Sequence, residues 1–340
     1  MSTKATQAPV VRGGARFGLS RGMLTVSVAL VLLLGASVVA APTSVSRSAL
    51  LGTLPFAAVL AIVAIGQTLV VQQGGIDLSV AGAVSLAVVI TTYVPAGTDG
   101  KLLGALVLGL GVAVAFGILN GLLVGWRGLN PIVATLGTNA LLYAVVLGIS
   151  GGSPRRTTDL LRRVAGGLSL GIPNSVYFAL AVVAIAAVTM KLTVGGRRFE
   201  AIGANPVAAA ATGLPTTWYR AGAYVWAQVL YWLGGVLLAG VIAQPTAFQG
   251  EAYLLPSVAA VVLGGTSLLG GRGFLVPTAV AAVFLSQLEQ FVLALGVSFA
   301  IRTLVEAAAL TVGVALYTVD WSAVRRRLAA SSARHETAAT

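Results

Sequence analysis

The side chains able to do chemistry inside this chain gather at two glycine-rich breaks in an otherwise apolar sequence. The first break is Gln72–Ser79, with the sequence Gln-Gln-Gly-Gly-Ile-Asp-Leu-Ser, and the second is Gly264–Gly273, which repeats its Gly-Gly-x-x-Leu pattern. A carboxylate at Asp77 could cap the helix that follows, because it would accept backbone N–H bonds and complement the helix dipole. A broken helix could also present polar backbone and a carboxylate to a water-filled path, as in transporters. The two interpretations of Asp77 are compatible, and the sequence leaves both open.

The residue types that many enzymes need are missing or lie far from these breaks. The chain has no Cys, and its one His, His335, lies in a polar tail. Thiolate chemistry, disulfides and His-based catalytic or metal sites are therefore excluded. No Gly-x-x-x-x-Gly-Lys-Ser/Thr sequence occurs, so we expect no ATP hydrolysis of the P-loop kind in this chain. We predict that the chain itself binds no metal and no cofactor.

The elements that must position the two breaks are predicted to be membrane-spanning helices. Hydrophobic residues make up 57% of the 340 residues and charged residues only 9%, against about 25% charged in soluble domains. A helix needs about 20 apolar residues to cross a bilayer. Eight charge-free runs meet this length, and two further segments contain isolated charges: 22–46, 48–76, 78–98, 102–126, 128–154, 164–190, 221–250, 252–271, 274–300 and 301–319. We predict an all-α polytopic membrane protein with about ten transmembrane helices.

Small residues recur at helical spacing in the fourth of these runs. Gly117, Gly121 and Gly125 are four residues apart and would share one helix face. In lipid, such a stripe lets two helices approach closely. We expect it to serve helix packing.

The positions of Lys and Arg predict that both termini are cytoplasmic. With ten alternating spans and an inner N-terminus, 14 of the 21 basic residues fall on inner segments and seven on outer ones, which follows the positive-inside rule. The run that ends at Ala41 resembles a signal peptide, but its length favours an uncleaved first span. Cytoplasmic loops, and not nucleic-acid binding, then account for the net charge of +12.

Three parts follow from this topology. Residues 1–21 are predicted to form a basic cytoplasmic tail, 22–320 the transmembrane domain, and 321–340 a polar cytoplasmic tail. Residues 195–218 are the predicted cytoplasmic loop with a short helix, because prolines and a glycine interrupt this Ala- and Thr-rich stretch.

The predicted extracellular loop, 151–175, has more basic residues than the positive-inside rule predicts for an outer loop. It carries four arginines, Arg155, Arg156, Arg162 and Arg163. Either this loop is simply an exception to a statistical rule, or the arginines form a basic docking surface for an acidic extracellular partner.

Three stretches resemble the membrane permease subunits of ABC importers of the ribose, xylose and arabinose type. The segment 74–81 is similar to the family signature Gly-Gly-Ile-Asp-Leu-Ser-Val-Gly, with Ala81 in place of the last glycine. The segment 201–213 is similar to the family's cytoplasmic coupling segment, and 259–273, preceded by Gln-Pro-Thr at 244–246, is similar to its C-terminal signature. The resemblance extends over residues 50–320.

This resemblance implies an ABC importer permease fold and a role in monosaccharide uptake through the cytoplasmic membrane. Two permease copies would sit on two ATPase subunits, which bind ATP and Mg, and an extracellular or periplasmic binding protein would deliver a pentose or hexose. This chain would then not be an enzyme. The residues expected to couple to the ATPase are Glu200, Ala201, Gly203, Asn205, Ala208, Ala209, Gly213, Leu214 and Pro215. Those expected at the helix breaks along the solute path are Gly74, Gly75, Asp77, Ser79, Asn120, Gly264, Gly265, Thr266 and Ser267.

The sequence departs from the family pattern at a few positions. Val207 stands where the family usually has an acid, and Glu289 and Gln290 stand where an Asn pair is typical. These departures leave the solute and the ATPase pairing open. Alternative functions are an ABC permease for a nucleoside or an amino acid and, with less support, an ion-coupled secondary carrier. The absence of an acidic ladder through the membrane disfavours the carrier.

Overall fold

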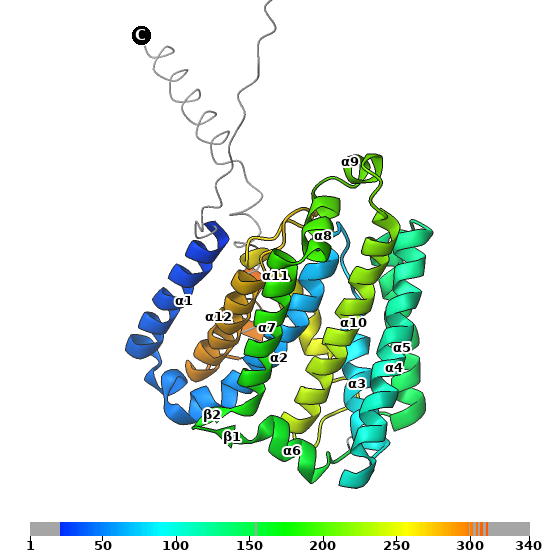
Figure 1. Cartoon of the computed structure of the whole chain (residues 1–340). Coiled ribbons are helices and arrows are strands. Elements are labelled where there is room, and N and C mark those ends of the chain that lie inside the picture. Colours follow the sequence, from blue (N-terminus) through cyan, green and yellow to red (C-terminus); the bar gives the residue numbers. More distant parts are fainter. Residues whose placement is uncertain are drawn as a thin grey trace, which may run out of the picture.

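The computed structural model of the protein describes residues 21–153 and 155–298, together with the single positions 300, 301, 304, 307, 308 and 311. Its described part is a bundle of helices with one short hairpin (Figure 1). The helices are α1 (Arg21–Ala40), η1 (Pro42–Val45), α2 (Arg47–Gln72), α3 (Val80–Tyr93), η2 (Asp99–Lys101), α4 (Leu102–Asn120), η3 (Gly121–Trp126), α5 (Pro131–Ser150), α6 (Asp159–Gly166), α7 (Asn174–Leu192), α8 (Val194–Ala204), α9 (Pro206–Ala211), α10 (Thr216–Val241), η4 (Glu251–Tyr253), α11 (Leu254–Leu263) and α12 (Leu275–Ala294). Strands β1 (Leu168–Ser169) and β2 (Ile172–Pro173) pair antiparallel. This hairpin is a small departure from the predicted all-α fold.

Seven helices in the described residues are long and apolar enough to cross a membrane: α1, α2, α4 with its flanking turns, α5, α7, α10 and α12. Two predicted spans, α3 and α11, have only 14 and 10 residues. The first break precedes α3, which ends before the turn at 94–97, and the second break ends α11. None of these boundaries carries a charge that a count of charge-free residues could detect. The tenth predicted span, 301–319, lies mostly outside the described residues, as do the two predicted tails apart from Arg21. The count of ten is therefore not confirmed.

The start of α10 differs from the prediction. The charge-free run predicted a span that begins at residue 221, and the preceding cytoplasmic loop was predicted to end at 218. Helix α10 instead begins at Thr216. Pro215 immediately precedes it and cannot continue the preceding turn as helix. Arg220 lies in the first turns of the helix, where a long basic side chain reaches toward the interface, so this charge does not mark a helix end.

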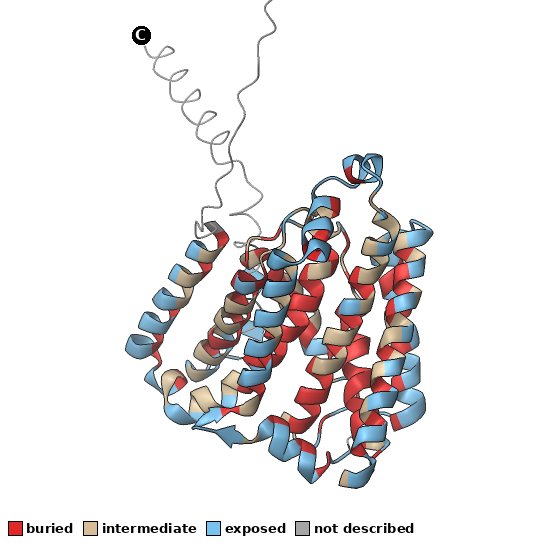
Figure 2. Ribbon diagram, in the orientation of Figure 1, coloured by how far each residue is buried: buried red, intermediate tan, exposed pale blue. Residues whose placement is uncertain are grey.

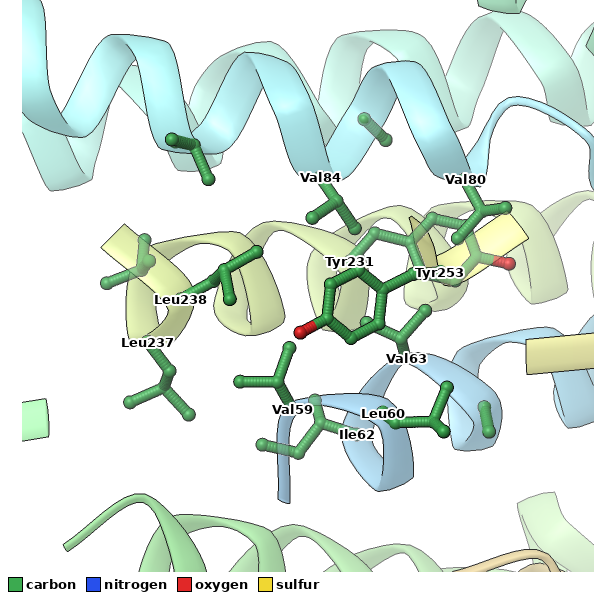
Figure 3. Packing of buried hydrophobic residues seen from close by; sticks show 14 of the residues in the cluster. Val59, Leu60, Ile62, Val63, Val80, Val84, Tyr231, Leu237, Leu238 and Tyr253 are labelled. Atoms are coloured by element: carbon green, nitrogen blue, oxygen red, sulfur yellow. The ribbon is translucent and has the colours of Figure 1, made fainter. Parts of the chain in front are cut away.

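Helices α2 and α10 form the centre of the bundle. In their most apolar 18-residue windows 61% of residues are buried, against 11% for α1 and 17% for α7. Figure 2 shows the exposed faces of the outer helices, which we assign to lipid. Figure 3 shows the Tyr231 ring of α10 between Val84 of α3 and Val63 of α2. Gly66 leaves room for this ring, since a Cβ placed there would lie 2.8 Å from Tyr231 Cε1.

The predicted glycine stripe packs α4 and η3 against α10. A Cβ at Gly117 would lie 2.7 Å from Val225 Cα, and one at Gly121 would lie 2.8 Å from the Ala221 carbonyl oxygen. A Cβ at Gly125 would lie 2.8 Å from the Ala221 nitrogen. Real Cβ atoms do not approach other atoms this closely, so only glycine allows the two backbones to meet. The packing role predicted for the stripe is confirmed.

The two ends of the bundle carry different structures. Figure 1 places α8 and α9 at one end, and α6 with the β1–β2 hairpin at the other. Both glycine-rich breaks lie at the α8 end, since the Gly271 N–H donates to the Gln72 carbonyl at 3.1 Å. We name the end with α8 and α9 the coupling end, and the opposite one the hairpin end.

Candidate functional site

Side chains from neighbouring helices hold the non-helical backbone of the first break. Thr135 of α5 accepts a hydrogen bond from the Leu78 N–H of the break at 2.9 Å, and Asn139 accepts one at 2.8 Å from the Gly82 N–H in the first turn of α3. With its amide nitrogen facing Tyr231, Gln67 of α2 bonds both backbone groups of Asp77 at 3.2 Å. Irregular backbone survives at membrane depth only where protein satisfies its polar groups. The break is therefore a built feature of the bundle.

The break also carries a buried polar network centred on Ser79. The Ser79 hydroxyl donates to Asp77 Oδ1 and accepts from Asn120 Nδ2 at 3.0 Å and Gln228 Nε2 at 2.7 Å. Thr138 donates to Asn120 Oδ1 at 2.6 Å and extends the network to α5. All five side chains are at most 2% exposed. Three predicted path residues, Asp77, Ser79 and Asn120, are thus brought together by the fold.

We expected Asp77 to be the N-cap of α3, but it lies two residues before the N-cap position. The N-cap of α3 is Ser79, which makes no side-chain cap bond. Asp77 Oδ1 instead accepts the Ser79 N–H at 2.9 Å. The carboxylate fixes the turn that leads into α3, and it does not satisfy the first turn of the helix itself.

The second break folds back on itself between α11 and α12. Gly264 packs against α12, where a Cβ would lie 2.7 Å from the Thr278 nitrogen, and Gly265 has a φ of +92° that favours glycine. Thr266 is 2% exposed, and its hydroxyl accepts the Phe274 N–H at 3.0 Å. Ser267 lies at the exposed tip and accepts the Leu269 N–H at 3.2 Å. These four predicted residues shape the turn.

Helix α8 sits directly on the two breaks. A Cβ at Gly203 would collide with the Gln72 carbonyl oxygen and lie 3.0 Å from the Gly271 carbonyl oxygen. Gln73 at the end of α2 donates its side-chain N–H to the Phe199 carbonyl of α8 at 2.9 Å. The predicted coupling segment and the predicted helix breaks therefore meet at one junction, which we call the α8 seat (Gln72, Gln73, Phe199, Gly203 and Gly271).

Helix α9 projects beyond α8 at the coupling end (Figure 1). Asn205 caps it by accepting the Ala208 N–H at 2.9 Å, and Pro206 occupies the first helical position. At its other end, the Leu214 N–H bonds the Ala209 carbonyl, and the Gly213 N–H bonds the Ala210 carbonyl. With a Gly213 φ of +80° this is a Schellman motif. We expected one short helix in the loop 195–218, and Asn205 separates two helices there, α8 and α9.

The predicted coupling residues divide between contact and exposure. Ala209 is buried, with 6% of its surface exposed, and so is Ile202, with 1%, which was not among the predicted residues. The outer face of α8 and α9 is exposed, with Val207 79% accessible beside Ala201, Asn205, Ala208, Gly213 and Pro215. Glu200 and Leu214 are half-buried between the two faces.

The four arginines of the predicted outer loop lie at the hairpin end. Arg156 and Arg162 pair with Asp159 at 3.7 and 3.4 Å, and Arg163 pairs with Asp99 at 3.9 Å. Arg155 lies over the Tyr93 ring at 5.0 Å from its centroid. Exposed pairs of this kind are weak, so the guanidinium groups remain accessible to an acidic surface.

A cavity of about 510 Å³ opens at the hairpin end and was not predicted from the sequence. Helix α2 contributes Thr53 and Phe56, and the segment around η4 contributes Gln249 and Tyr253. Helix α12 contributes Ser286, Glu289 and Gln290. None of the predicted path residues lines it. The polar pair at 289–290 was the one signal in the sequence, because polar groups in a span face the bundle interior or a cavity.

Comparison with known proteins defines the family. A family profile described as the permease component of a branched-chain amino acid transport system matches residues 49–319. The ribose import permease protein RbsC of Bacillus subtilis is 34% identical over 265 residues, which cover 76% of this chain and 81% of that protein. The chain belongs to this permease family. The predicted resemblance to ribose-type ABC permeases is confirmed.

Other relatives of the permease cover most of its length as well. The probable ABC transporter permease protein y4mJ of Sinorhizobium fredii is 33% identical over 82% of this chain and 84% of its own. The autoinducer 2 import system permease protein LsrD of Photorhabdus temperata is 29% identical over 88% of this chain and 91% of its own. Comparison with solved structures finds no significant match. The permease is a multi-pass protein of the cell membrane and a transport component, not a catalytic enzyme.

Proposed function

We propose that this permease is the membrane subunit of an ATP-driven importer that carries a monosaccharide of pentose or hexose size into the cell. The solute class follows its relatives, which include ribose import permeases. A separate ATPase supplies the energy, an extracellular or periplasmic binding protein delivers the solute, and two permease copies form the translocating unit.

The α8 seat is the observation that carries this proposal. A subunit driven from outside needs a projecting element for the motor and a rigid connection from that element to the spans. Helix α9 is the projecting element, and Gly203 brings α8 into van der Waals contact with the end of α2 and the second break. Because packed interfaces switch between discrete arrangements and do not deform continuously, a shift of α8 moves both breaks together.

At the first break, the shift of α8 becomes a change of the permease between an outward-facing and an inward-facing state. The Ser79 network fixes the inner end of α3 to α4, α5 and α10, so α3 follows its neighbours when α2 moves. Asp77 and its partners act as the pivot that holds the broken helix, and the glycines at 74 and 75 supply the bend. The coupling end then faces the cytoplasm and the hairpin end faces the outside, where the exposed arginines receive the binding protein.

A matched pair of glycine substitutions tests the α8 seat. Gly203→Ala places a methyl group against two carbonyl oxygens, whereas Gly195→Ala in the same helix meets only Thr193 Oγ1 at 3.7 Å. The assay is ribose uptake in proteoliposomes that contain the permease, the ATPase that co-purifies with it, and the sugar-loaded binding protein. We expect Gly203→Ala to lower uptake about tenfold or more, an effect of about 1.4 kcal/mol, and Gly195→Ala to retain it.

The same preparation tests the class of transporter. Uptake must depend on ATP and on the ATPase, and it must persist when ion gradients are dissipated. Ribose uptake by the permease without any ATPase would contradict the proposal. Uptake of leucine or of a nucleoside in place of ribose would retain the ATP-driven mechanism and overturn the solute class.

A further inference from the structure

A small cavity lies where α3, α4, α5 and α10 meet inside the bundle. Its volume is about 10 Å³, which is about the smallest space that holds one water molecule. Most of the lining is apolar and comes from the four helices, with Ala83 and Ala113 among the contributors. The two polar contributors are Gln228 and Trp232, which lie one turn apart on α10. Since a cavity with an entirely apolar lining stays dry, these two side chains decide whether water binds here.

Each of these two side chains has a buried polar atom that lacks a partner in the described part of the chain. Gln228 is 1% exposed, and its Nε2 donates to the Ser79 hydroxyl at 2.7 Å. Its Oε1 is buried and accepts no hydrogen bond, and the buried Trp232 Nε1–H donates none. Buried polar groups in folded proteins are nearly always bonded to protein or to ordered water. An acceptor and a donor at one water-sized cavity therefore indicate a ligand that can both donate and accept.

Water has the capacities that this pair requires. One molecule would accept a hydrogen bond from the Trp232 indole N–H and donate one to Gln228 Oε1. The amide oxygen repels an anion and the indole hydrogen repels a cation, so the pair selects a neutral ligand. Gly109 of α4 keeps the space beside the indole open, because a Cβ placed there would lie 2.8 Å from Trp232 Nε1. A water-mediated bond of this kind is nearly as favourable in enthalpy as a direct one.

We propose that this cavity binds one structural water molecule that bridges Gln228 to Trp232. The water extends the Ser79 network by one turn of α10, so that a chain of hydrogen bonds runs from Asp77 at the first break to the middle of α10. It therefore links the geometry of the break to the contact that α10 makes with α3 and α4. The inference rests on the packing of this chain and is independent of the solute that the permease carries.

X-ray footprinting tests for the water directly, because radiolysis of a bound water oxidises the side chains that it touches, even when they are buried. The full-length permease in detergent receives a short X-ray exposure, and peptide mass spectrometry measures the oxidation of each aromatic residue. We expect oxidation at Trp232 and none at the neighbouring Tyr231, which is fully buried and whose hydroxyl bonds Gln67 at 2.7 Å. Trp126, which is 64% exposed, reports oxidation by bulk solvent.

A matched pair of substitutions on α4 tests whether the oxidation at Trp232 comes from the cavity. Ala113→Val fills the cavity, whereas Ala115→Val adds the same two methyl groups to an exposed position of the same helix. We expect Ala113→Val to lose the oxidation at Trp232 and Ala115→Val to retain it at the wild-type level. Ala83→Val fills the cavity from α3 and replaces Ala113→Val if that variant does not fold.

Thermal unfolding gives a second measurement that does not depend on oxidation. Trp232→Phe removes the N–H and leaves the bridging water with one partner. We expect it to lower the unfolding midpoint by about 2–4 °C in the wild-type chain. The loss should be smaller in Ala113→Val, where the water is already displaced and the substitution removes an unpaired donor.

Three outcomes would overturn the bridge. Oxidation at Trp232 that is absent in the wild type would show that no water touches the indole. Equal oxidation in the wild type and Ala113→Val would place the source outside the cavity, and equal loss in Ala113→Val and Ala115→Val would attribute it to altered packing of α4. Equal thermal shifts from Trp232→Phe in both backgrounds would show that the N–H has no water to bond.

Discussion

Ser79 joins the first break to α4 and α10 through one hydroxyl group. This group donates one hydrogen bond and accepts two, which is its full capacity. Each of its partners is buried, so the loss of the hydroxyl leaves a carboxylate and two amide groups short of a bond at the same time. A buried polar group without a partner costs about 1–3 kcal/mol. The residue therefore contributes more to stability than its size suggests.

We expect Ser79→Ala to lower the unfolding free energy of the permease by about 3 kcal/mol. Thermal unfolding in detergent measures the effect, and Ser175→Ala is the matched control. Ser175 is also fully buried, but its hydroxyl makes no hydrogen bond in the described part of the chain. Its replacement removes a buried hydroxyl without breaking a network. Similar losses in both variants would contradict the role of Ser79 as the centre of the network.

At the scale of elements, the contact between α4 and α10 depends on missing side chains. The glycine stripe removes Cβ atoms where the α4–η3 segment crosses the start of α10, so that backbone meets backbone. In lipid such close packing replaces the hydrophobic driving force between helices. Gly111 lies on the same helix α4, and a Cβ there would meet no atom within 4 Å. The two kinds of glycine on this segment should respond in opposite ways to alanine.

Gly121→Ala should destabilise the permease, because the new methyl group lies 2.8 Å from the Ala221 carbonyl. Overpacking of this kind costs about 1–3 kcal/mol. Gly111→Ala should be neutral or stabilising, since alanine is favoured over glycine in a helix by about 0.5–1 kcal/mol. Thermal unfolding of the two variants in parallel gives the comparison. A lower midpoint for Gly111→Ala than for Gly121→Ala would show that the stripe does not form the contact.

The cap at the C-terminal end of α9 allows a second test of how a single element contributes to transport. Gly213 has a φ of +80° and no atom within 4 Å of a Cβ placed there, so a substitution is opposed by backbone conformation and not by crowding. An L-residue in this conformation costs about 1–2 kcal/mol, except that Asn adopts it readily. We expect Gly213→Ala to impair coupled uptake, and Gly213→Asn to restore most of it. Uptake per ATP hydrolysed is the measurement, and equal activity of Gly213→Ala and wild type would contradict the role of this cap.

For the whole molecule, the sequence predicted the helical membrane fold and the segments that form the α8 seat. It did so because span length, glycine breaks and the coupling motif are local patterns. The cavity was missed because Thr53, Gln249 and Gln290 come from three distant segments, and no local pattern links them. The count of spans was unreliable for a related reason. Uncharged turns bound α3 and α11, so the charge pattern does not show where these helices end, and Arg220 lies inside a helix.

The orientation of the whole bundle is the remaining prediction, and the absence of natural cysteine allows a direct test. Ser169→Cys lies in the exposed hairpin, and Ala208→Cys lies on the exposed face of α9. Because these sites are at opposite ends and the predicted topology places the loop that contains α9 in the cytoplasm, we expect an impermeant maleimide to label Ser169→Cys in intact cells and Ala208→Cys only after permeabilisation. The reverse pattern would invert the bundle and exclude α9 as the contact for a cytoplasmic ATPase. Labelling of both sites in intact cells would mean that the two ends do not lie on opposite sides of the membrane.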